Sequence, residues 1–200
     1  MDELDLLDWK RRVFALYARV REERDPIDAW NLWRAERERL FREHPQSPVP
    51  ADERSAYPGP RLFDYDRAWR LCAEVEAVDE KRLELPSSDG ATMTMRRFAV
   101  ARADEVELEL YWVDAYGGGM FVPFADTTSG DETYGAGRYI LDTVKGADLG
   151  VDDHGRLVLD FNFAYQPSCS YDDRWTCPLT PPANRLDMPI RAGERQRGAR

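Results

Sequence analysis

Apolar residues in the first part of the chain follow a helical period. Six of them recur every three or four residues: Leu6, Trp9, Val13, Leu16, Tyr17 and Val20. This spacing predicts a helix over residues 4–23 with one apolar face. Asp25 followed by Pro26 predicts the N-cap and first turn of a second helix, which ends at His44 and Pro45. We therefore expect an N-terminal pair of helices.

Beyond residue 66 the pattern changes to the alternation that is typical of strands. Strand-like segments lie at 69–75, 81–85, 93–100, 105–113, 120–124, 138–144, 156–163 and 186–190. No helical segments alternate with them, which disfavours a parallel doubly wound sheet. The pattern predicts a mainly β (α+β) protein: an antiparallel β-barrel or sandwich of about eight strands, preceded by the pair of helices.

Proline spacing suggests how the chain is divided. Five prolines between residues 44 and 60 predict an extended, semi-rigid linker. We predict four parts, namely a helical hairpin at 1–44, the linker at 45–60, an antiparallel β domain at 61–193 and a basic tail at 194–200.

Charge and composition exclude some classes of function. The formal net charge of -10 argues against binding to nucleic acid, whose phosphates would be repelled. No window is long and apolar enough for a membrane span, and the acidic start does not resemble a secretory signal. Three cysteines without an export signal suit a reducing compartment, so we expect a soluble cytoplasmic protein. Cofactor and oligomeric state stay unassigned.

Two polar stretches interrupt the strand pattern. In the loop of residues 125–137, Gly135 and Gly137 precede Arg138, which suggests an anion-cradling turn or an ordinary polar loop closed by a bulge. In the segment 156–163, Asp160 and Asn162 share the face opposite the Leu and Phe residues. A half-buried Asp160 needs a partner, and we expect Arg138 to provide it. Such a pair fits a structural role and a ligand site equally well.

Cys169 and Cys177 are the candidates for thiol chemistry. Their separation is too long for a usual zinc pair, and the chain has only two histidines, so a metal site is disfavoured. A disulfide that closes a small loop and two reduced, buried thiols both remain open. A serine hydrolase is disfavoured because Ser129 lacks the GxSxG context.

Several longer segments carry a family resemblance. They are SPV (47–49), LFDYDRAWR (62–70), FVPFADTTSGDETYGAGRYI (121–140), DFNFAYQPSCSY (160–171), TCPLTPPANRL (176–186) and IRAGE (190–194). Together they resemble the bacterial and archaeal family known as domain of unknown function 1684, with Gln166 standing where the family pattern has Asn. The resemblance implies no activity. It implies that the polar residues of these motifs belong to a site more than to packing.

The sequence thus predicts a pocket for a small, anionic molecule at one end of the β domain. Its predicted lining is Arg138, Asp160, Asn162, Tyr165 and Asn184, with Thr128, Tyr134 and Tyr139 as further ligand-binding candidates. If the protein is an enzyme, Asp160 or Asp126 is the expected general base and Arg138 binds the anionic group. The alternatives are a non-catalytic structural or protein-interaction module and, more weakly, thiol redox chemistry through Cys169 and Cys177.

Overall fold

The chain begins with two helices, as its apolar spacing predicts. The structure, a computed structural model, describes residues 2–196. Helix α1 spans Asp2–Glu22 and helix α2 spans Pro26–Glu43. The side chain of Asp25 caps α2 by accepting hydrogen bonds from the amides of Ile27 and Asp28, and Pro26 stands in the first turn. None of the described helices is long and apolar enough to cross a bilayer.

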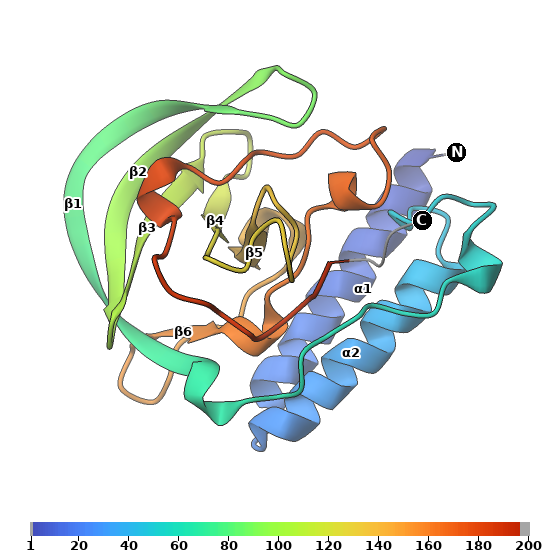
Figure 1. Cartoon of the computed structure of the whole chain (residues 1–200), viewed down its shortest axis with the longest axis horizontal. Helices are drawn as coiled ribbons and strands as arrows, with labels where there is room; N and C mark the ends of the chain where they lie inside the picture. The colour runs from blue at the N-terminus through green and yellow to red at the C-terminus, as the bar shows by residue number, and fades with distance from the viewer. Residues whose placement is uncertain (1, 197–200) are drawn as a thin grey trace.

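Six antiparallel strands form a strongly bent, nearly closed barrel, which confirms the predicted fold class (Figure 1). They are β1 (Arg70–Pro86), β2 (Thr92–Ala103), β3 (Val106–Val113), β4 (Gly119–Phe124), β5 (Arg138–Asp142) and β6 (Leu157–Asp160). Their order in the sheet is β5-β4-β3-β2-β1-β6. Beyond β6, Tyr165 exchanges two backbone hydrogen bonds with Tyr139 of β5, and this contact brings the two ends of the sheet together.

The structure has fewer strands than the eight segments that alternate in sequence. Segments 69–75 and 81–85 belong to one long strand, β1, whose pairing with β2 shifts register between Ala77 and Lys81. Segment 186–190 forms no strand, although Leu186 donates a backbone hydrogen bond to Ala125. Segment 156–163 leaves the strand at Asp160, because the Asp160 carboxylate accepts the amide of Asn162 and starts a 3-10 turn.

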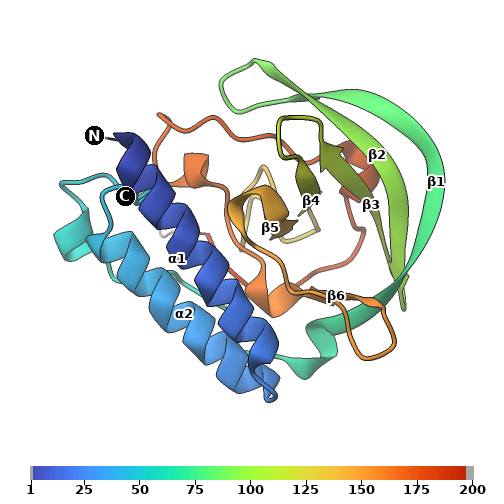
Figure 2. The same cartoon turned by 180° about the vertical axis from the view of Figure 1, so that it is seen from behind.

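Helices and barrel share one apolar core. Figure 2 shows the two helices side by side along one side of the barrel, with β1, β2 and β3 forming the far wall. Trp33 is 1% exposed, and its indole N–H donates to the hydroxyl of Tyr17 at 3.0 Å. Trp30 donates to the carbonyl of Asn162 at 3.0 Å, which ties α2 to the turn after β6. Both tryptophans therefore bury their rings against the body without leaving a polar group unpaired.

The segment of residues 190–196 packs one face against the body, with Ile190, Ala192 and Glu194 buried and Arg191 exposed. The Glu194 side chain is fully buried and accepts hydrogen bonds from Arg37 Nε at 2.7 Å and from the amide of Gln166 at 2.6 Å. Of the predicted basic tail, residues 194–196 bond to the body through their backbone amides, and residues 197–200 lie outside the described residues. The predicted division into four parts stays a prediction.

Candidate functional site

Arg138 is buried and fully engaged, and its partner is not the predicted one. The guanidinium donates to Asp126 Oδ2 at 2.9 Å, to the Ile190 carbonyl at 2.8 Å and to the Ala192 carbonyl. The predicted ion pair between Arg138 and Asp160 is therefore wrong. Burial lowers the pKa of Arg138 to about 10, and Asp126 opposes the shift, so Arg138 stays charged at neutral pH.

The loop before β5 explains why Asp126 takes this position. Asp126 Oδ1 accepts the Thr128 amide at 2.9 Å and the Thr128 hydroxyl at 2.6 Å, and that hydroxyl also meets Thr133 at 2.9 Å. The other carboxylate oxygen of Asp126, Oδ2, accepts a hydrogen bond from the Ile190 amide at 2.9 Å. The sequence left open whether this loop cradles an external anion. In the structure the negative charge beside Arg138 comes from the chain itself, because the Asp126 carboxylate accepts the hydrogen bonds of the loop.

The other predicted ligand-binding residues are spread over the molecule. Asn184 is fully buried and links β3 to β4 through the backbone of Glu109 and the carbonyl of Pro123. The hydroxyl of Tyr139 donates to the Pro178 carbonyl at 2.6 Å, and Tyr165 lines a small cavity of about 70 Å³ beside α1. Asp160 lines a different cavity. The five residues predicted to meet in one pocket are thus not gathered in one place.

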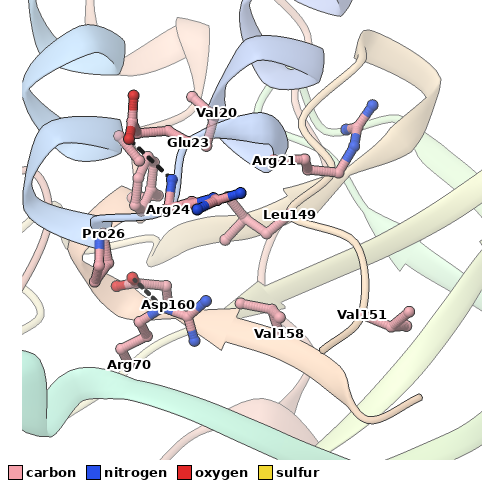
Figure 3. A pocket seen from close by; sticks show the side chains of 12 residues that line it. Val20, Arg21, Glu23, Arg24, Pro26, Arg70, Leu149, Val151, Val158 and Asp160 are labelled. Atoms are coloured by element: carbon pink, nitrogen blue, oxygen red, sulfur yellow. Dashed lines mark hydrogen bonds and ion pairs between the residues drawn. The ribbon is translucent and has the colours of Figure 1, made fainter. Parts of the chain in front are cut away.

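The cavity at Asp160 lies where the turn between α1 and α2 meets β1 and β6 (Figure 3). Its volume is about 120 Å³. The lining comprises Val20, Arg21, Glu23, Arg24, Pro26, Ala29, Arg70, Leu149, Val151, Val158, Asp160 and Phe163. Arg70 and Asp160 are directly opposed in the β1–β6 pairing, so the sheet register itself sets the guanidinium beside the carboxylate.

Asp160 is held by four polar contacts. Oδ1 accepts the amide of Asn162 at 3.0 Å and its side-chain nitrogen at 2.8 Å. Oδ2 accepts the Tyr65 hydroxyl at 3.0 Å and lies 3.8 Å from Arg70 Nε. Burial raises the pKa of Asp160, and these contacts oppose the shift. Burial and the neighbouring Asp160 raise the pKa of Tyr65, which therefore remains a hydrogen-bond donor.

The arginines around this cavity keep donors free for a ligand. Within residues 2–196, Arg70 has only the 3.8 Å contact with Asp160 and a 3.7 Å contact with the sulfur of Cys72 as polar partners. The side chain of Arg24 has no hydrogen bond or ion pair to another described residue, whereas Arg21 donates to the Asp148 carbonyl at 2.6 Å. A binding site is expected to combine a buried carboxylate with guanidinium groups whose N–H donors have no acceptor in the protein, as at this cavity.

Sequence reasoning missed Arg70, Arg24 and Tyr65. Tyr65 and Arg70 lie in the motif of residues 62–70, which offered a signal, because a family motif outside the strands is a place to look for site residues. Arg24 lies among charged residues at a helix end, and the sequence there does not distinguish a ligand-binding arginine from an ordinary surface arginine. No group of three His, Cys, Asp or Glu side chains suited to a metal ion is found among the described residues.

Cys169 and Cys177 do lie together. The amide of Cys169 donates to the sulfur of Cys177 at 3.4 Å, and the Tyr134 hydroxyl lies 3.9 Å from the sulfur of Cys169. Neither cysteine is in a disulfide. This cluster is remote from Asp160, because it contacts the first half of α1 rather than its end.

These features define a class: a small antiparallel barrel with a helical hairpin packed along one side. Residues 55–195 match the model of the family described as Protein of unknown function (DUF1684), and the chain belongs to that family, as its motifs predict. It is similar to the solution NMR structure of an uncharacterised protein from Haloarcula marismortui. The two are 34% identical, with a TM-score of 0.57, over 82% of this chain and 91% of that one. No curated protein matches.

Proposed function

We propose that the protein binds a small anionic molecule in the cavity at Asp160. The observation that carries the proposal is the pairing of a buried carboxylate with guanidinium groups that retain free donors, Arg70 above all. An anionic group entering between Arg70 and Arg24 would satisfy these donors. In this proposal Arg70 binds the anionic group, the role that the sequence predicted for Arg138.

The cavity has room for a small anionic group. Its volume of about 120 Å³ is enough for a carboxylate, sulfate or phosphate group. A larger ligand would extend towards solvent past Arg24, which is exposed. Asp160 is the residue we assign to proton transfer if the bound molecule is a substrate, because burial brings its pKa closer to neutrality.

A structural role for the same network is the competing function. Asp160 caps the turn after β6, and Asn162 in turn accepts the amide of Asp66 at 2.9 Å and donates to its carbonyl at 2.8 Å. These contacts knit the segment before β1 to the barrel without any ligand. The two functions are separable, because the structural contacts of Asp160 involve Tyr65 and Asn162 rather than the free donors of Arg70.

Arg70→Ala is expected to weaken anion binding by about ten- to a hundredfold, since one charge-assisted hydrogen bond contributes about 1.5–3 kcal/mol. The measurement is a titration of the protein with sulfate, followed by the NMR amide shifts of Ala29, Leu149 and Val158 around the cavity. Arg82→Ala is the matched control, because Arg82 lies on the same strand and is 77% exposed. Equal sulfate affinity in wild type and Arg70→Ala, or no shifts at the cavity, would contradict the proposal.

Sulfate binding is also expected to tighten as the pH falls from about 7 to about 4. Burial raises the pKa of Asp160, so the carboxylate takes up a proton at a higher pH than an exposed Asp would, and its repulsion of the anion then disappears. Sulfate keeps its own charge over the range. Asp160→Asn removes the charge at every pH and should flatten the profile at the tight-binding level. A profile that keeps its slope in Asp160→Asn would assign the effect to another group.

A further inference from the structure

The two cysteines of the segment 168–177 have a fixed relative position. Cys169 lies in the 3-10 turn of Ser168–Ser170, and its amide donates to the sulfur of Cys177. Cys177 is anchored to the turn between β1 and β2, because its amide donates to the Ser88 hydroxyl at 3.0 Å and its carbonyl accepts the Ser88 amide at 2.9 Å. The sulfur of Cys177 is therefore presented to Cys169 by the barrel rather than by a free loop.

The two thiols differ in their access to solvent. Cys177 is 1% exposed and lines a cavity of about 250 Å³ with Trp9 and Trp175. Cys169 is half-buried and lines an open hollow of about 360 Å³ on the outer side of the segment. A reagent arriving from solvent therefore reaches Cys169 more readily than Cys177.

The surroundings of the two thiols also shift their pKa values in opposite directions. A hydrogen bond from the Cys177 thiol, with further ones from Ser88 and Tyr134, lowers the pKa of Cys169 to about 6, against the effect of burial. The same contact and burial raise the pKa of Cys177. The contact between the two residues thus favours the thiolate at the accessible sulfur and the thiol at the buried one.

We propose that Cys169 and Cys177 form a redox-active dithiol that reduces small disulfides by thiol–disulfide exchange, with Cys169 as the attacking sulfur and Cys177 as the resolving one. The proposal rests on the contact between the two residues and on their unequal access. It does not depend on the anion cavity, which lies at the other end of α1.

The reaction balances without a further reagent. The Cys169 thiolate attacks one sulfur of a disulfide R–S–S–R, forms a mixed disulfide and expels RS⁻, which takes a proton from solvent. Cys177 then loses its proton and attacks the Cys169 sulfur, which forms the Cys169–Cys177 disulfide and expels the second RS⁻. The protein gives up two electrons and the one proton of Cys177, and solvent supplies the second proton, so one disulfide becomes two thiols.

Two buried donors next to the cysteines lack a partner. Among the described residues, the Ser170 hydroxyl and the Trp175 indole N–H have no hydrogen-bond partner. Ser170 lines the hollow at Cys169, and Trp175 lines the cavity at Cys177. Buried donors of this kind lower stability, so the segment that carries the cysteines is less firmly held than a fully bonded one.

The test is the reaction with cystamine, followed by mass spectrometry of the intact protein and its peptides. The reduced protein is expected to lose two hydrogens and to contain a Cys169–Cys177 disulfide without a retained adduct. Cys177→Ser removes the resolving thiol, so the mixed disulfide should persist on Cys169. Cys72→Ser is the matched control and should behave as wild type, because Cys72 lies on β1 with no cysteine contact. Peptide analysis of the wild-type protein identifies the Cys169–Cys177 disulfide directly, so the test holds even if the Cys177→Ser variant does not fold.

The pH profile distinguishes a poised thiolate from an ordinary thiol. Since thiolates of lower pKa are weaker nucleophiles, the rate at pH 7 should exceed that of an ordinary thiol only about fourfold. The rate of cystamine attack should nevertheless reach half its plateau near pH 6. Tyr134→Phe, which removes a donor to the thiolate, should move this midpoint upward. Adducts retained on wild-type Cys169, or a midpoint near that of a free thiol, would overturn the proposal.

Discussion

Arg138→Met is expected to lower the free energy of unfolding by about 3–5 kcal/mol, because removing one partner of a buried ion pair leaves the other uncompensated. The Asp126 carboxylate would lose its guanidinium, and the carbonyls of Ile190 and Ala192 would lose their donor. Urea unfolding followed by circular dichroism measures the change. The core itself should stay intact, since Met replaces the aliphatic part of Arg and its thioether can pack near the Phe124 ring, over which the guanidinium lies.

Arg191→Met is the matched control for this result. Arg191 lies on the same C-terminal segment, pairs with Glu132 and has a side chain that is 60% exposed. Exposed pairs contribute about 0–1 kcal/mol, so the control should unfold close to wild type. A loss in Arg138→Met no larger than in Arg191→Met would mean that the buried pair does not stabilise the loop as we infer.

Gly137→Ala is expected to cost about 2–5 kcal/mol, through two separate effects. The φ of +94° is unfavourable for any side chain and contributes about 1–2 kcal/mol. A Cβ atom would also stand 2.5 Å from the Phe124 carbonyl oxygen and overlap the Thr180 hydroxyl, which adds about 1–3 kcal/mol of overpacking. Thermal and urea unfolding of the variant provide the measurement.

Gly130→Ala separates these two effects. Its φ of +95° matches that of Gly137, yet a Cβ there would meet no atom within 4 Å. Only the backbone effect remains, so we expect a loss of about 1–2 kcal/mol. If the two variants lose the same free energy of unfolding, the close approach of Gly137 to Phe124 does not contribute to the cost of Gly137→Ala.

The elements that depend on local information could be predicted from sequence. Asp25 and Pro26 mark the start of α2 because capping and proline geometry act within one turn. The number of strands does not follow from the alternating pattern, for a physical reason. The polar stretch within β1 suggests a break, yet cross-strand pairs such as Arg102 with Glu76 and Arg96 with Glu80 let a solvent-facing strand continue.

The candidate site depends on contacts far apart in sequence, which local patterns do not specify. Arg138 selects Asp126 because the 125–137 loop folds back on β5, and nothing near Arg138 or Asp160 reveals that choice. The strand pattern indicates only that the carboxylate of Asp160 needs a partner. Its neighbour Arg70 comes from the first residue of β1, a pairing that becomes visible only once the order of strands is known. The cysteine contact likewise follows from the anchoring of Cys177 by Ser88.

The buried return of residues 190–194 has a consequence for biosynthesis. Arg37 and Arg138 leave the ribosome long before Glu194 and the carbonyls of Ile190 and Ala192, which are their partners in the finished molecule. Until then each nascent guanidinium must stay hydrated, because burying it without a partner is too unfavourable. The last step of folding therefore waits until this segment has emerged from the exit tunnel, and a chain stalled before residue 190 would leave both guanidinium groups without these partners.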